Sequence, residues 1–280
     1  MKPSTRAFAG AALFWLALAA LLHVLAVLGM PGAWGAMVHT LLFGWITSMI
    51  VTVNYHTVPV FSGRDFPSQP PIWAHWWLLA GGVALAVAGQ LADLPVLSIA
   101  GIAGELAAAL CFMLNIVLLL RYGPARPRMP APPIANQPQI DRLGTQATRA
   151  SGMCLPLALV LLLGARSGWP GEWVLAAEHL ATLGWIMLMI VGVSYHVLPR
   201  FSGQGVRPGP WARAQLACHF AAVLLMVPAL GFGWGGLFAV GGTLMAVALG
   251  LFAWTIWPAL RPVLPRPGVI SLAVREARHE

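Results

Sequence analysis

The chain has 280 residues, of which 59% are hydrophobic and 9% are charged, and its net charge is +8. Its mean hydropathy of +0.79 excludes a soluble globular domain and predicts an all-α integral membrane protein. The excess of basic residues does not indicate a nucleic-acid partner, because such residues are enriched on the cytoplasmic side of membrane proteins.

Eight apolar stretches are long enough to cross a bilayer, which is therefore the first expected partner of the chain. In chain order they are residues 7–29, 36–60, 71–92, 96–120, 150–165, 179–197, 211–232 and 237–260. The fifth is the shortest. We expect the first to be a retained helix rather than a signal peptide, because its apolar run is long and no clear cleavage site follows it.

The basic residues predict the orientation of these spans. If the N-terminus is cytoplasmic, 15 of the 16 Lys and Arg residues fall on the cytoplasmic side, and only Arg166 lies outside. This bias predicts a multi-pass protein of the inner (cytoplasmic) membrane with both termini in the cytoplasm.

A proline-rich segment divides the chain into two halves. Residues 123–147 are expected to form an extended cytoplasmic linker, because their proline density opposes a regular helix. The linker separates a first four-helix repeat (1–122) from a second (148–262), and residues 263–280 form a polar tail. Four spans per half predict two parallel repeats related by a pseudo-twofold axis along the membrane normal.

The two halves share a duplicated helix. Residues 39–63 and 179–203 are identical at 14 of 25 positions, at a constant offset of 140. The identities include His39 and His179 near the outer side, and His56 and His196 near the inner side. We expect these two helices to face each other at the centre of the molecule, with the other helices enclosing them.

The four histidines are candidate ligands for haem or for metal ions. Two facing neutral imidazoles on opposing helices are the ligands of a six-coordinate haem iron, and polar residues inside membrane spans are costly and usually functional. His39 with His179 is the first candidate pair. His56 with His196 is a second candidate site for a haem or a metal ion.

Three further residues belong to this hypothesis. Arg64 and Arg200 follow the inner histidines and would meet haem propionates, although their placement also fits the cytoplasmic excess of arginine. Glu105 is the only acidic residue deep in a span. It would relay protons, pair with a histidine, mark a pathway, or remain a protonated carboxyl hydrogen-bonded within the bundle.

One part of the chain resembles a known family. His39-Thr40 opens a long apolar helix that carries Gly44 inside and Tyr55 towards its far end. This pattern is similar to the second helix of the catalytic subunit of haem-copper oxidases and nitric oxide reductases. The resemblance covers about 25 residues in each half and implies that His39 ligates a low-spin haem. Through the duplication the same role falls on His179.

The chain departs from that family in ways that exclude a complete oxidase. Those subunits have about twelve helices and further histidines that hold copper or iron beside a second haem. This chain has no His-His pair, so a full oxygen- or nitric-oxide-reducing centre is not expected. The absence of a CxxCH motif predicts non-covalent b-type haem, one or two per chain.

These observations predict a membrane haemoprotein that transfers electrons or binds and senses a diatomic gas such as nitric oxide. Its redox partner would be a quinol, a cytochrome or another membrane subunit, and any enzymatic role would be that of a haem-dependent oxidoreductase component. The alternative is a transporter or channel for a small solute or metal ion, with histidines lining a path on the pseudo-twofold axis. A purely structural accessory subunit would leave the repeated histidines unexplained.

Overall fold

The structure is a computed structural model that describes the chain except for residues 1, 128–133, 135, 208 and 262–280. The polar tail at 263–280 and the centre of the proline-rich linker therefore lie outside the described residues.

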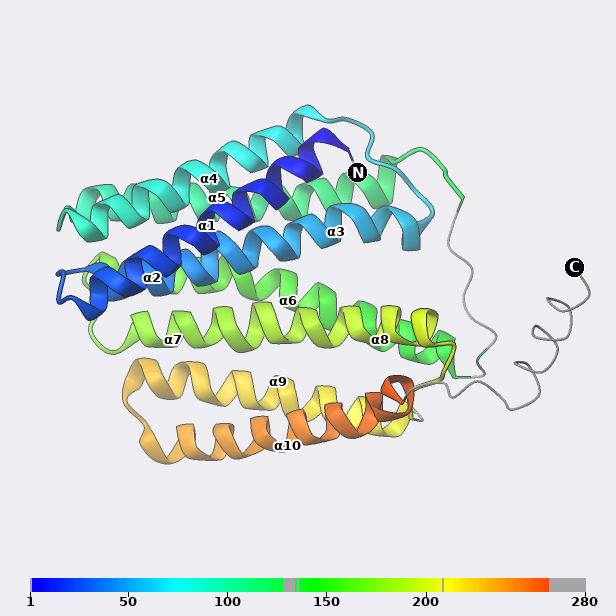
Figure 1. Cartoon of the computed structure of the whole chain (residues 1–280). Helices are drawn as coiled ribbons and strands as arrows, with labels where there is room; N and C mark the ends of the chain where they lie inside the picture. Colours follow the sequence, from blue (N-terminus) through cyan, green and yellow to red (C-terminus); the bar gives the residue numbers. More distant parts are fainter. Residues whose placement is uncertain (1, 128–133, 135, 208, 262–280) are drawn as a thin grey trace, which may run out of the picture.

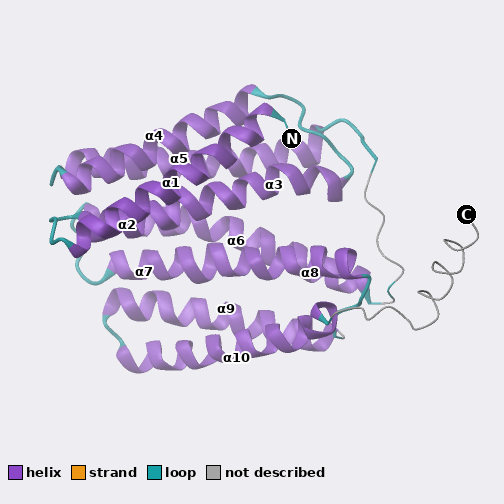
Figure 2. Cartoon of the chain, in the orientation of Figure 1, coloured by secondary structure: helices purple, strands orange, loops and turns teal. Residues whose placement is uncertain are grey.

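The described chain is helical throughout, and eight of its helices are long and apolar enough to cross a membrane. Figure 2 shows that they run side by side. The spans are α1 (Pro3–Val27); α2 (Ala33–His39), η1 (Thr40–Ile46) and α3 (Thr47–Ser62) in one continuous helix; α4 (Pro70–Leu91); α5 (Pro95–Tyr122); α6 (Gln137–Arg166); α7 (Trp173–His179), η2 (Leu180–Met187) and α8 (Leu188–Ser202) in a second continuous helix; α9 (Gly209–Phe232); and α10 (Gly235–Leu260). A multi-pass membrane protein is thus confirmed.

The helices form two groups that follow the order of the chain. Helices α1 to α5 make the first group and α6 to α10 the second, and α5 packs against α6 where the groups meet. In Figure 1 the N-terminus, the linker after α5 and the end of α10 lie at the same end of the bundle. We call this the terminal end and the opposite one the far end. An even number of spans in each half requires this arrangement.

Three boundaries differ from the expectation. Helix α6 begins at Gln137 and has 30 residues, so it is among the longest spans rather than the shortest. Its first turns are rich in polar residues, but Ile140 and Leu143 are buried in a cluster with residues of α8. Pro138 lies in the first turn of the helix, where proline is tolerated. His39 and His179 do not begin their helices. Each follows six residues of α-helix.

Both duplicated helices contain a π-helical segment at the same place, directly after the outer histidine. A π segment leaves backbone carbonyls without their usual partners, and side chains satisfy several of them here. Thr47 donates to the carbonyl of Leu42 at 2.8 Å. His219 contacts the carbonyl of Leu183 at 2.9 Å, and Ser151 donates to that of Trp185 at 2.6 Å. Such segments are frequent at functional sites.

The two π segments touch each other where the halves meet. Trp185 is fully buried, and its indole Nε1 donates to the hydroxyl of Thr47 in the other half at 3.1 Å. Phe112 of α5 packs edge-on against the same indole. The expectation that the two duplicated helices meet at the centre is therefore confirmed at this level.

Candidate functional site

The outer histidine of the first half pairs with the buried glutamate. His39 is the last residue of α2, near the far end of the bundle, and its Nε2 lies 2.7 Å from Oε1 of Glu105 on α5. The two side chains are only 5% and 1% exposed. Of the alternatives for Glu105, pairing with a histidine is confirmed.

Helix α4 makes room for this pair. A Cβ at Gly82 would lie 2.9 Å from Cγ of Glu105 and 2.8 Å from its backbone nitrogen, so only glycine allows α5 to approach so closely. The other oxygen of the carboxylate, Oε2, is buried without a hydrogen-bond partner among the described residues. Phe43 covers the imidazole, with 4.9 Å between the ring centres. The pair thus lies in an apolar setting with one acceptor free.

The outer histidine of the second half is more exposed. Nδ1 of His179 contacts the carbonyl of Leu175, one turn earlier, at 2.9 Å. This contact is the usual partner of Nδ1 in a ligating histidine, whose Nε2 remains free for the ligand. The ring packs edge-on against Phe238 at 5.9 Å.

The two outer histidines have different acidic neighbours. Glu178 directly precedes His179 in α7 and is partly buried. His39 is bonded to Glu105 rather than to a group of the second half.

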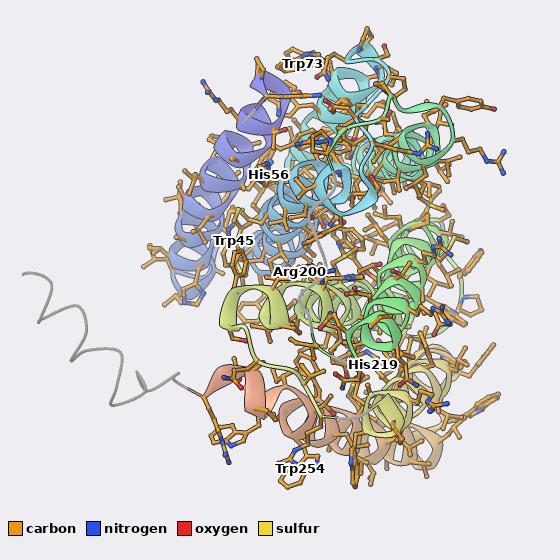
Figure 3. The ribbon with its side chains drawn as sticks, turned by 90° about the vertical axis from the view of Figure 1, so that its right-hand side faces the viewer. Trp45, His56, Trp73, Arg200, His219 and Trp254 are labelled. Carbon is orange, nitrogen blue, oxygen red and sulfur yellow. The ribbon has the colours of Figure 1, made fainter. Side chains whose placement is uncertain are left out.

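The inner histidines are in different surroundings. His56 on α3 is exposed, and Figure 3 shows it together with Arg200 in a view onto the terminal end. Nδ1 of His196 on α8 lies 2.9 Å from Oδ1 of Asp141 on α6. Its Nε2 faces α6, where Thr145 Oγ1 lies at 3.4 Å.

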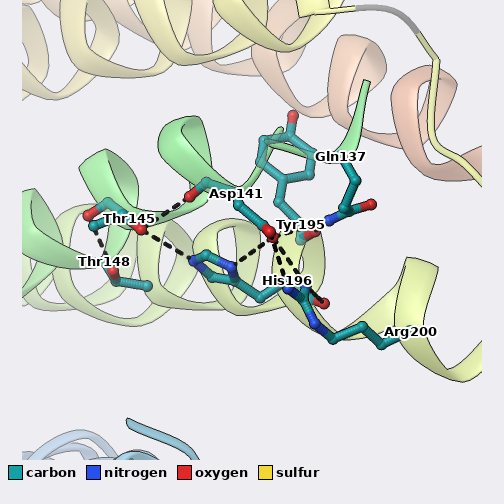
Figure 4. A network of polar contacts seen from close by, with 7 residues as sticks. All are labelled: Gln137, Asp141, Thr145, Thr148, Tyr195, His196 and Arg200. Atoms are coloured by element: carbon teal, nitrogen blue, oxygen red, sulfur yellow. Dashed lines mark hydrogen bonds and ion pairs between the residues drawn. The ribbon is translucent and has the colours of Figure 1, made fainter. Parts of the chain in front are cut away.

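Asp141 organises this inner cluster (Figure 4). Arg200 donates from Nη1 and Nη2 to the two carboxylate oxygens, each at 2.9 Å. Gln137 donates to the same carboxylate at 2.9 Å. Phe61 of the first half stacks on His196 at 5.8 Å and lies beneath the guanidinium at 5.0 Å. The guanidinium charge is therefore compensated within the protein.

Arg64, one of the two arginines expected to meet haem propionates, contacts the protein backbone. Nη1 of Arg64 donates to the carbonyl of Gly123 at 2.9 Å, which joins the loop after α3 to the end of α5. The two arginines are thus placed on different partners, although both lie near the terminal end.

A second polar contact recurs at the offset of 140 and was not predicted from the sequence. The hydroxyl of Tyr55 contacts Nδ1 of His75 at 2.7 Å and accepts from Asn115 at 2.8 Å. In the second half Tyr195 donates to Gln215 at 3.1 Å. Residues 75 and 215 are equivalent in the duplication, so a polar contact recurs although the residue types differ.

The available signals for these residues were uneven. Tyr55 and Tyr195 each directly precede a repeated histidine in the sequence, but their partners differ in type between the halves and form no repeated motif. Asp141 lies in the segment that was expected to be an extended linker outside every span. Its contact with His196 was therefore not predicted. Neither a protein-family model nor a curated protein matches the chain.

Proposed function

We propose that this chain is a membrane haemoprotein in which His39 and His179 hold a b-type haem near the far end of the bundle. One observation carries the proposal. Equivalent histidines of a duplicated helix stand directly before equivalent π segments, and these segments contact each other where the two halves meet. Its function would be electron transfer, or binding and sensing of a diatomic gas such as nitric oxide.

The donor atoms suit such a ligand pair. Among the described residues, hydrogen bonds occupy Nε2 of His39 and Nδ1 of His179. Each imidazole therefore retains one nitrogen for a ligand. A carboxylate bonded to a ligating histidine fixes its ring and raises its basicity, which is the role that Glu105 would have. Phe43 and Phe238 provide apolar contact beside the two rings.

The haem would supply the one-electron chemistry, and the protein would set its environment. Glu105 would favour the more positive state of any group bound to His39, because its charge lies in a region of low dielectric constant. The apolar side chains would keep water from the iron. A quinol, a cytochrome or another membrane subunit would then exchange electrons at the surface.

A second haem or metal ion between His56 and His196 stays a prediction with less support. Asp141 already occupies one nitrogen of His196 and neutralises Arg200. Arg64 is bonded to a backbone carbonyl. A propionate would have to compete with these partners.

Orientation in the inner membrane also remains a proposal, with the terminal end in the cytoplasm. Its support is the distribution of Lys and Arg, which leaves only Arg166 on the other side. The parallel-repeat arrangement gains support from the equivalent π segments and the equivalent tyrosine contacts.

The alternative function, transport of a small solute or metal ion, is favoured by one observation. A carboxylate with an unpartnered oxygen next to a histidine, both buried in a membrane helix bundle, is typical of ion and proton pathways. Such a site would lie inside the first half rather than on an axis between the halves.

The absorbance spectrum of the purified protein separates the two functions. The haem proposal predicts a Soret band, α and β bands on reduction, and a pyridine haemochrome of the b type. Iron content should approach one or two atoms per chain. Protein from haem-replete cells that shows neither haem absorbance nor iron would contradict the proposal and leave transport as the function to test.

A further inference from the structure

Three buried polar groups in the first half have an oxygen without a hydrogen-bond partner among the described residues: Ser98 Oγ, Glu105 Oε2 and Ser48 Oγ. Their side chains are at most 3% exposed. Inside a membrane such a group costs several kcal/mol unless water or a ligand satisfies it. These oxygens therefore indicate positions where a small polar molecule binds.

The second half shows that the fold does not require these polar groups. At the offset of 140, the equivalents of Ser98, Glu105 and Ser48 are Phe238, Met245 and Leu188. All three replacements are apolar. At these three positions the polar character is thus confined to the first half, so it is not needed to build the shared helix arrangement.

The three groups follow one another through the first half. Ser98 and Glu105 are seven residues apart on α5, so they share one face about 10 Å apart. Ser48 and Tyr55 have the same spacing on α3. Because the Tyr55 hydroxyl bonds to α4 and α5, Ser48 is directed to the same side. Ser48 stands nine residues after His39 and so lies between the levels of Glu105 and Tyr55.

The series continues to the terminal end. Tyr55, His75 and Asn115 form the next level, and His75 is six residues, or about 9 Å, beyond Gln69 along the chain. There Ser4 donates to Oε1 of Gln69 at 3.0 Å. Beside this bond lies a shallow pocket that is open to the surface and lined by Lys2, Pro3, Ser4, Gln69 and Trp73.

We propose that these side chains line a water-filled path for protons through the first half, from the surface pocket beside Ser4 past Glu105 to Ser98. Hydroxyl groups both donate and accept hydrogen bonds, and the amide of Asn115 offers donors and an acceptor. A chain of bridging waters held by such groups passes protons without a change in the fold. The path does not depend on bound haem, so the two proposals fail or succeed separately.

Radiolytic labelling of the intact protein tests the path. Hydroxyl radicals formed from bound water by an X-ray pulse modify the side chains that touch that water. Tyr55 and Tyr195 form a matched pair, because they are equivalent and are 4% and 0% exposed. In wild-type protein, Tyr55 should be modified about ten times faster than Tyr195, since water occupies only the first half. Equal slow rates at the two tyrosines would overturn the proposal.

A variant gives a second, independent test. Ser48→Leu installs the residue that the second half has at this level, and should lower the labelling rate of Tyr55 to that of Tyr195. Ser48→Ala should act in the same direction with less change in volume. The control is Ser151→Ala, a buried serine of the second half whose hydroxyl donates to a backbone carbonyl. It should leave Tyr55 labelling unchanged. A Tyr55 rate that stays at the wild-type value in both Ser48 variants would contradict the path.

Discussion

Removing one hydroxyl from each half compares the two copies of the duplicated unit directly. The hydroxyl of Tyr55 accepts from Asn115 at 2.8 Å and contacts Nδ1 of His75 at 2.7 Å, so it donates to that nitrogen. In Tyr55→Phe, His75 loses its partner, whereas Asn115 keeps a 3.2 Å bond to the carbonyl of Pro71. Since a buried polar group left unsatisfied costs about 1–3 kcal/mol, we expect Tyr55→Phe to lower the free energy of unfolding by about 2–3 kcal/mol.

The equivalent substitution in the second half should cost less. Tyr195 makes a single longer bond to Gln215, at 3.1 Å, so Tyr195→Phe should lower the free energy of unfolding by about 1 kcal/mol. Reversible unfolding of both variants in mixed micelles, followed by tryptophan fluorescence, measures the difference. If Tyr195→Phe lowers the free energy of unfolding as much as Tyr55→Phe does, the different hydrogen bonds of the two tyrosines do not determine these losses.

Three further substitutions test contacts that hold the helices together, each measured by the same unfolding assay. Gly82→Ala places a Cβ 2.8 Å from the backbone of α5 and should cost about 1–3 kcal/mol, whereas Gly81→Ala, with nothing within 4 Å, should stay within about 0.5 kcal/mol of wild type. Asp141→Asn removes the charge that an arginine and a histidine share and should cost about 2 kcal/mol, because its 22% exposure reduces the loss below that of a fully buried pair; a change below about 0.5 kcal/mol would contradict this role. The hydrogen bond from Lys2 holds the pKa of Asp65 below its usual range, against the raising effect of burial. The contribution of this exposed pair is therefore present above the ordinary carboxyl pKa and lost as pH falls through the lowered one, and Asp65→Asn should cost less than about 1 kcal/mol at neutral pH and nothing in strong acid.

The number of spans was predictable from the sequence because hydropathy over a membrane-length window needs no knowledge of packing. The boundaries of the spans were less predictable. The segment from Gln137 to Gln146 has too many polar residues for a hydropathy reading, yet its apolar residues recur on one helical face and pack on α8. A test for helical periodicity across the expected linker would have extended α6.

Parts of the site were also within reach of the sequence. The duplication singled out the four histidines, and Glu105 stood out as a lone acidic residue in a span, so its contact with a histidine was one of the stated alternatives. Its partner, His39, depends on where α5 passes α2, which is a matter of tertiary packing. The π segments were not predicted. Thr47 of the same helix bonds a carbonyl of the first segment, whereas His219 and Ser151, which contact carbonyls of the second, come from other helices.

The most direct test of the haem proposal is the reduced-minus-oxidised spectrum of single histidine variants. His39→Ala and His179→Ala should each abolish or strongly alter the low-spin signal of the wild-type protein. His56→Ala serves as the comparison, because that side chain is exposed at the terminal end and should leave the far-end haem in place. An unchanged low-spin spectrum in both His39→Ala and His179→Ala would contradict ligation by this pair.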